Sequence, residues 1–155
     1  MIKRLGLVPL PVEGGFFRRT WTGPAQPPAG RSTGTAIYFL VTDTDFSALH
    51  RLITDEVWCF HAGDPVEHVQ LSPGEPAPRV TRLGGDLAGG QVPQLVVPGG
   101  VWQGARLAPG AALGWGLLTC FMAPGWVDGE FALGDRAVLC REFPVAAEWI
   151  EALTR

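Results

Sequence analysis

The stretch FSALHRLITDEVWCFHAGDP, residues 46–65, holds two short segments in which apolar and polar residues alternate, separated by a Thr-Asp pair. Successive side chains of an extended strand point to opposite faces, so every second residue shares a face. The alternation therefore predicts two neighbouring strands with one shared face, made by the even-numbered positions Phe46, Ala48, His50, Leu52, Glu56, Trp58 and Phe60.

This predicted face places a histidine and a carboxylate in an apolar wall. A buried carboxylate is costly unless it finds a cation, a hydrogen-bond donor or a proton, so Glu56 needs a partner. Two interpretations stay open. His50 and Glu56 either satisfy each other or a backbone group as a structural pair, or they form a functional centre in a pocket.

The period of two recurs along the rest of the chain, in segments that are often rich in β-branched and aromatic residues and are bounded by Gly, Pro, Asp or Ser. Residues 146–153 instead have helical spacing, with their apolar side chains on one face. We therefore expect an all-β fold of two facing antiparallel sheets with a short C-terminal helix. The expected strands are residues 35–41, 46–52, 56–61, 66–71, 79–84, 93–98, 102–107 and 117–122.

The length of 155 residues predicts a single domain over residues 1–155. A formal net charge of -3, with scattered arginines, offers no basic stripe, so we expect no nucleic-acid partner. Residues 107–127 carry no charge, but Pro-Gly pairs at 109–110 and 124–125 interrupt them, so they predict strands and no membrane span.

The three cysteines, Cys59, Cys120 and Cys140, cannot all pair within one chain, and no two of them form a CxxC motif. We interpret them as reduced core residues. The N-terminal segment meets proline within ten residues and lacks the apolar run of a signal peptide, so we expect a cytoplasmic protein.

Two motifs carry a resemblance to a known family. His50, Glu56 and Gly63 fit the spacing H-x-H-x3-E-x6-G of the first cupin motif, and residues 98–103, PGGVWQ, are similar to the second, P-x-G-x2-H. With VEGGFFRRTW (12–21) and APGWVDGEFALGD (123–135), the chain resembles the cupin 5 family, formerly domain of unknown function 985, of the RmlC-like cupin superfamily. The resemblance implies a double-stranded β-helix, the cupin jelly roll, with a pocket between its sheets.

The chain departs from the cupin metal-ligand pattern at two of four positions. Leu52 stands at the second histidine position and Gln103 at the third, so only His50 and Glu56 remain. Losing two imidazoles weakens any zinc, iron or copper site, and we expect no cofactor and no resident metal. A metal-dependent cupin with the reduced ligand set His50, Glu56 and Gln103 is one alternative.

The family also resembles the dTDP-sugar epimerases, which use a metal-free jelly-roll pocket and a histidine base. The resemblance implies an isomerase-like or epimerase-like enzyme in which His50 is the base and Glu56 fixes its tautomer. Such an enzyme needs an acid on the opposite face, and Tyr38 is the only tyrosine. If Tyr38 faces outward, a two-residue mechanism that uses it fails. A non-catalytic, ligand-binding cupin is the other alternative.

The catalytic candidates are therefore His50 and Glu56, and the expected partners are a small polar or sugar-like ligand and a second subunit in a homodimer. Trp58, Phe60 and Trp102 either stack on a ligand or fill the core. His61 and His68 have no partner at ligand spacing and are expected at the surface or an interface. Asp128 or Glu130 reaches the pocket mouth or caps a loop. The ligand-binding candidates are Glu13, Arg18, Tyr38, Trp58, Phe60 and Gln103.

Overall fold

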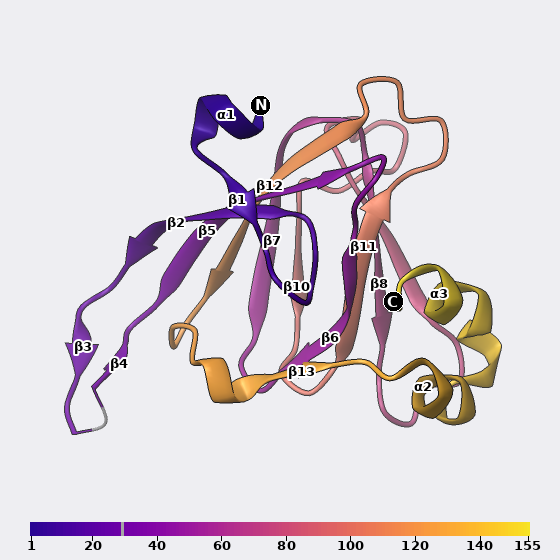
Figure 1. Ribbon diagram of the computed structural model, residues 1–155. Helices are drawn as coiled ribbons and strands as arrows, with labels where there is room; N and C mark the ends of the chain where they lie inside the picture. The colour runs from indigo at the N-terminus through magenta and orange to yellow at the C-terminus, as the bar shows by residue number, and fades with distance from the viewer. Residues whose placement is uncertain (29) are drawn as a thin grey trace.

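The computed structural model describes residues 1–28 and 30–155, and within them two antiparallel sheets face each other (Figure 1). The first sheet has the strand order β1-β2-β5-β12-β7-β10 and the second the order β13-β6-β11-β8-β9. This is the predicted all-β fold, and each of the eight predicted segments overlaps a strand, although 46–52, 79–84 and 93–98 extend slightly beyond β6, β9 and β10. The prediction of two facing antiparallel sheets is confirmed.

The strands of the first sheet are β1 (Val8–Pro9), β2 (Phe16–Thr22), β5 (Thr35–Thr42), β7 (Glu56–Gly63), β10 (Gln94–Val97) and β12 (Trp115–Met122). Those of the second sheet are β6 (Ser47–Leu52), β8 (Val66–Leu71), β9 (Arg79–Leu83), β11 (Trp102–Leu107) and β13 (Phe131–Leu133). A separate ribbon pairs β3 (Ala25–Gln26) with β4 (Arg31–Ser32).

Three short α-helices complete the fold: α1 (Ile2–Leu5), α2 (Arg136–Glu142) and α3 (Ala147–Ala152). The 3-10 turns are η1 (Asp128–Glu130) and η2 (Pro144–Ala146). The predicted C-terminal helix is α3, with Ile150 fully buried. Helix α2 was not predicted, although the side chain of Asp135 caps it by accepting a hydrogen bond from the Val138 N–H at 2.8 Å.

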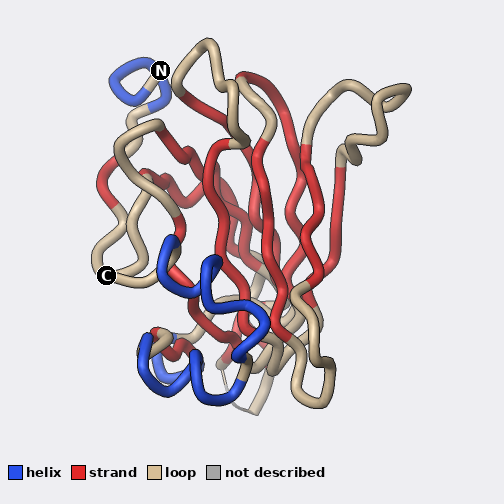
Figure 2. Tube along the Cα trace, turned by 90° about the vertical axis from the view of Figure 1, so that its right-hand side faces the viewer, coloured by secondary structure: helices blue, strands red, loops and turns tan. Residues whose placement is uncertain are grey.

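The two sheets are covered differently on their outer faces. Helices α2 and α3 lie against the second sheet, where Leu49 and Val69 pack with Leu139 and Ile150 in a core outside the barrel. Figure 2 shows both helices to one side of the strands. The middle of the second sheet is thus buried on both faces, which explains why every residue of β8 is buried although its sequence alternates, while the edge strand β9 is largely exposed.

The barrel interior holds a second core, built from the inward side chains of both sheets. Phe39 of β5 meets Trp58 of β7 edge to face, with ring centroids 5.5 Å apart. Leu118 and Ala105 close this core from β12 and β11, and both are fully buried. Phe39 and Trp58 also line a cavity between the sheets, so this core forms part of the cavity wall.

Within residues 1–28 and 30–155, no helix has the length and apolar character needed to cross a membrane. The uncharged stretch 107–127 contains the end of β11 and all of β12, as its Pro-Gly breaks predicted.

Candidate functional site

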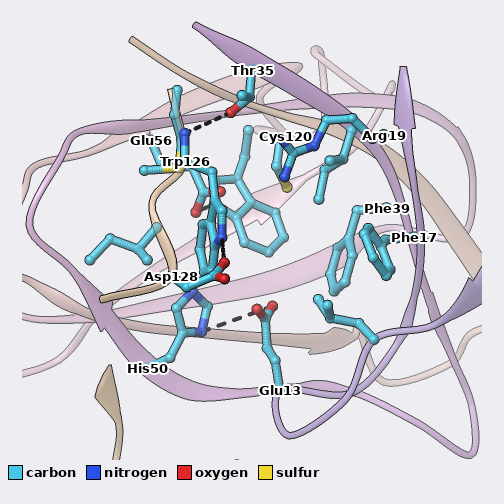
Figure 3. Close-up of a pocket in the computed structure, with 15 residues that line it drawn as sticks. Glu13, Phe17, Arg19, Thr35, Phe39, His50, Glu56, Cys120, Trp126 and Asp128 are labelled. Carbon is cyan, nitrogen blue, oxygen red and sulfur yellow. Dashed lines mark hydrogen bonds and ion pairs between the residues drawn. The ribbon is translucent and has the colours of Figure 1, made fainter. Parts of the chain in front are cut away.

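A cavity of about 290 Å³ lies between the two sheets, next to the interior core, and Figure 3 shows the residues that line it. Its walls are mostly apolar, and one of their side chains is the buried Trp58. Its polar groups are few, as in most small-molecule sites. They are Glu13, Arg19, Thr35, His50, Glu56 and Asp128.

His50 and Glu56 reach this cavity from adjacent segments of the chain. In β6, His50 and Leu52 point inward, while Leu49 points out to the helices. After a short turn, β7 begins with Glu56 and again directs its even-numbered residues inward. Strand alternation therefore brings both candidates to one cavity, where they are 2% and 7% exposed.

The hydrogen bond of His50 defines its tautomer. Its Nδ1 lies 2.9 Å from the carbonyl oxygen of Ala48, and because a carbonyl only accepts, Nδ1 carries the hydrogen. In the neutral form of the ring, the lone pair therefore lies on Nε2, which has no hydrogen-bond partner among the described residues. Phe131 stacks on the ring with centroids 5.4 Å apart and fixes its plane. His50 thus presents a proton acceptor to a ligand.

Among the described residues, Glu13 is the carboxylate that lies within ion-pair distance of His50. Its Oε1 lies 3.9 Å from His50 Nδ1 (Figure 3) and accepts a hydrogen bond from Ser47 Oγ at 2.7 Å. Glu13 comes from the turn between β1 and β2, where Val12 and Gly15 have φ angles of 70° and 71°. Positive φ at a β-branched residue is strained backbone, of the kind that concentrates at functional sites.

Glu56 is held by two N–H donors. Its Oε2 accepts from Trp58 Nε1 at 3.0 Å and from Gln103 Nε2 at 2.8 Å. Burial in the apolar wall raises the pKa of Glu56 to about 7, while the nearby His50 is the main influence that lowers it. Glu56 is therefore present as both acid and carboxylate near neutral pH.

His50 bonds to a backbone group, one of the two kinds of partner expected for a structural role, and it forms no hydrogen bond with Glu56. A backbone carbonyl fixes the tautomer, and Glu56 bonds to Trp58 and Gln103. The two side chains share the cavity without a direct hydrogen bond. Both are consequently free to contact a ligand between them.

Gln103 lies behind the cavity wall and joins Glu56 to His68. Its Oε1 accepts from Trp58 Nε1 at 3.0 Å and from His68 Nε2 at 3.1 Å. His68 was expected at the surface or an interface, and this was wrong: it is fully buried, because β8 turns its even-numbered residues into the barrel. Burial lowers the pKa of His68 to about 3, so its ring is neutral. Gln103 is thus a supporting residue behind the pocket.

Tyr38, Arg18 and Phe60 do not line the cavity. Tyr38 points away from its neighbours Ile37 and Phe39, which do, and lies on the outer face of the first sheet. There the Arg18 guanidinium sits 5.5 Å from the Tyr38 ring centroid. This corrects the expectation for Tyr38 as the opposing acid, since the sheet separates it from His50. Phe60 points inward and packs in the interior core.

Arg19 takes the place expected for Arg18. In β2, Phe17 and Arg19 line the cavity, while Arg18 pairs with Tyr38 across the neighbouring strand. The sequence FFRR contains two apolar and two basic residues in succession, so its pattern does not reveal which residue of each pair points inward. Trp102 also faces outward, into the core under the helices, with the Arg51 guanidinium over its ring.

The segment after β12 forms one side of the cavity mouth. The Trp126 backbone N–H donates to Thr35 Oγ1 at 3.1 Å, and its indole N–H donates to Asp128 Oδ1 at 2.7 Å (Figure 3). Asp128 lines the cavity. Glu130 instead forms an ion pair with Arg31 at 2.8 Å, so of the two acidic candidates Asp128 is the one at the mouth.

The donor set does not fit a resident transition metal. No group of three or more His, Cys, Asp or Glu side chains within residues 1–28 and 30–155 is arranged to hold a metal ion. Leu52 is part of the apolar wall, and Gln103 Oε1 already accepts two N–H groups. We therefore derive no chemistry through a metal.

Comparison with known proteins identifies the family. The family Cupin_5, described as Cupin superfamily (DUF985), matches residues 1–134. The chain belongs to the Cupin_5 family. The Cupin_5 match ends just before helix α2, and the resemblance seen in the sequence motifs is confirmed.

Solved structures similar to this Cupin_5 chain include a protein from Shewanella oneidensis, with 33% identity, a TM-score of 0.90, and coverage of 99% of this chain and 94% of that one. A hypothetical protein from Leishmania major has 31% identity, a TM-score of 0.88, and coverage of 99% and 96%. A cupin 2 conserved barrel domain protein from Rhodopseudomonas palustris, at 17% identity and a TM-score of 0.57, covers 94% and 83% and shares the fold. No curated protein matches the sequence.

Proposed function

We propose that this Cupin_5 protein binds a small polar, sugar-like or keto-containing molecule in the cavity and catalyses a metal-independent proton transfer of the isomerase or epimerase type. One observation carries the proposal: His50, with a free Nε2 lone pair, and Glu56, with a pKa of about 7, line the same cavity. A proton acceptor and a carboxyl group of raised pKa that line one cavity are typical of acid–base sites.

Each residue has one role in this reaction. His50 Nε2 removes a proton from a carbon next to a carbonyl, and protonated Glu56 donates its proton to the carbonyl oxygen, which yields an enol. In an α-hydroxy carbonyl substrate, Glu56 then takes back a proton from the neighbouring hydroxyl while His50 returns its proton to the former carbonyl carbon, so the carbonyl moves by one position and the isomer forms. Glu56 supplies the acid that Tyr38 cannot supply from the outer face.

The surroundings of the two residues support these roles. Phe131 and the Ala48 carbonyl hold the His50 ring in one plane and one tautomer. Trp58 and Gln103 donate to Oε2 of Glu56, so the proton of the acid form belongs on Oε1. Fixed orientation of both groups lowers the cost of reaching the reactive geometry.

The test is proton exchange with solvent. The protein is incubated in D₂O with a panel of aldoses, ketoses and 2-keto acids, and loss of the signal of the hydrogen next to the carbonyl is followed by proton NMR. His50→Gln is expected to lower the exchange rate by roughly 10²–10⁴-fold, the contribution of a general base. Glu56→Gln is expected to lower the exchange rate as well, because an amide is too weak an acid to transfer a proton to the carbonyl oxygen.

His61→Gln is the matched control, since His61 lies exposed on the outer face of β7. Exchange that survives in His50→Gln would end the enzymatic proposal. If the wild-type protein binds members of the panel without exchange, and His50→Gln weakens that binding, the non-catalytic ligand-binding alternative is correct.

We further propose a cytoplasmic homodimer. The outer face of the first sheet exposes Trp21 (45%) and Val96 (48%), and large apolar side chains on an uncovered sheet favour a protein partner. The free thiols of Cys59, Cys120 and Cys140 are compatible with a reducing compartment. Light scattering coupled to gel filtration would give twice the chain mass of 16.6 kDa for a dimer.

A further inference from the structure

A surface groove opens directly onto the cavity mouth. It has a volume of about 450 Å³ and shares four lining residues with the cavity: Arg19, Thr35, Trp126 and Asp128. The hydroxyl-bearing Thr22 and Ser32 extend it outward from the shared residues. The groove and the cavity therefore adjoin at these four residues, and together they make a combined space with an inner part, the cavity, and an outer part, the groove.

The two parts differ in the charges that they present. The inner part contains the carboxyl groups of Glu13 and Glu56. The outer part contains two guanidinium groups, but Arg31 is already neutralised by an ion pair with Glu130 at 2.8 Å and also donates to Gly125 O and Thr54 Oγ1. Among the described residues, Arg19 is therefore the arginine of the combined space whose charge is not balanced by an ion pair.

Arg19 has no hydrogen bond or ion pair to any other described residue, and its side chain is exposed. Figure 3 shows its side chain extending from its strand in among the residues that line the cavity. Asp128 lines the same mouth and keeps its negative charge, since its Oδ1 accepts only the neutral Trp126 indole N–H, but it forms no ion pair with Arg19. A guanidinium with all its donors free is suited to a planar or tetrahedral oxyanion.

We propose that the ligand of this site is an anion, whose carboxylate or phosphate group binds Arg19 at the mouth while its neutral body enters the cavity. This inference deepens the proposed function and rests on one part of it, namely that the ligand binds in the cavity. The carboxylate of Glu13 opposes an anionic group in the inner part, so the charge distribution also sets the ligand's direction: the anionic end points outward and the reacting carbon lies near His50.

The test uses probes that need no knowledge of the ligand body. Protein labelled with ¹⁵N is titrated with inorganic phosphate, and separately with acetate, at constant ionic strength held with chloride, while the side-chain Nε–H signals of arginine are followed by NMR. The Arg19 signal and the backbone signals of Thr35 and Trp126 are expected to shift and saturate. Arg19→Gln is expected to weaken this binding by about 10-fold or more, the effect of losing one charged hydrogen-bonding partner.

Arg18→Gln is a matched control, because Arg18 is the next residue of the same strand and lies on the opposite face, against Tyr38. It is expected to keep the wild-type affinity. Tighter binding of phosphate than of acetate assigns the anion to a phosphate ester, and the reverse order assigns it to a carboxylic acid; both results support the proposal. A non-saturating Arg19 signal, or equal effects of the two variants, would overturn it.

Methylammonium is titrated as the opposite-charge probe. Saturable binding of this cation at Thr35 and Trp126, without anion binding, would also overturn the proposal, since Glu13 and Asp128 would then determine the ligand charge. The outcome is independent of catalysis. His50→Gln is expected to leave phosphate or acetate binding at Arg19 unchanged, so a failure of the exchange reaction and a failure of the anion site are seen in different measurements.

Discussion

The side-chain N–H of Gln103 donates a hydrogen bond to Oε2 of Glu56 at 2.8 Å. The side-chain amide cannot exchange the positions of its oxygen and nitrogen, because its oxygen accepts hydrogen bonds from the N–H groups of Trp58 and His68. Glu56 and Trp58 lie in the first sheet, and Gln103 and His68 in the second, so the network joins the two sheets behind the cavity. It also determines which oxygen of Glu56 is available to a ligand.

The protonation of Glu56 should be visible in the stability of the protein. Its pKa is about 7 in the folded state against an ordinary value of 4.5, mainly because of burial. Between these pH values the folded state binds more protons than the unfolded state, so the free energy of unfolding falls as pH rises, by at most about 1.4 kcal/mol per pH unit. Glu56→Gln is expected to remove this slope.

Urea unfolding at pH 4.5, 5.5, 6.5 and 7.5 measures the effect, and the exposed Glu75→Gln is the control. Relative to the control, Glu56→Gln should gain stability toward pH 7.5. An identical pH dependence in the two variants would show that Glu56 does not carry the proton.

His68 should give the opposite sign. Burial lowers its pKa from 6.5 to about 3, so the unfolded state binds more protons in this range. Its contribution to stability is fully present above pH 6.5 and is lost as pH falls toward 3. His68→Gln is expected to weaken the acid sensitivity of the urea midpoint, and His61→Gln, on the outer face, should keep the wild-type profile. A steeper acid loss in His68→Gln than in the wild type would contradict the assignment.

The fold was predictable because strand alternation survives in a single sequence. His50, Glu56 and Trp58 could be placed on one wall from their even spacing. The alternation does not tell the inside of a barrel from the core under the helices. The sequence marks both Trp58 and Trp102 as buried aromatic residues. Trp58 faces the barrel interior from the first sheet, whereas Trp102 faces the core under the helices from the second sheet.

The site was less predictable where a shift of one residue along a strand decides whether a side chain faces the cavity or the outer face of the sheet. Tyr38 and Arg18 lie outside, and Arg19 lies inside, although each belongs to a strand that lines the cavity. A slip of one residue moves a side chain to the other face. His68 was missed for a different reason: its partner Gln103 is 35 positions away, so local spacing carries no sign of the contact.

Metal binding offers a test of the donor set. We expect the protein as purified to hold no stoichiometric transition metal, because Leu52 and Gln103 replace two imidazoles of the cupin pattern. The double change Leu52→His with Gln103→His supplies those imidazoles beside His50 and Glu56, and is expected to bind Zn²⁺ in calorimetric titrations. Elemental analysis that finds about one metal per wild-type chain, removable by a chelator, would contradict the prediction.

The turn that carries Glu13 should be sensitive to a single added methyl group. Gly15 has a φ of 71°, and a Cβ there would lie 2.8 Å from Phe39 Cζ and 2.9 Å from the Leu40 carbonyl oxygen. Gly74 also has a positive φ, 84°, but a Cβ there meets nothing within 4 Å. Gly74→Ala should cost only the backbone term of about 1–2 kcal/mol. Gly15→Ala should cost about 1–3 kcal/mol more, through overpacking against Phe39.

Urea unfolding of the two alanine variants separates the two costs, since both share the backbone term. Because the displaced turn holds Glu13 against Ser47 and near His50, Gly15→Ala should also shift the His50 ring signals in NMR spectra, whereas Gly74→Ala should leave them in place. Equal stability losses with unchanged His50 signals would mean that the turn accommodates the methyl group without moving Glu13, and that its close packing does not position the carboxylate.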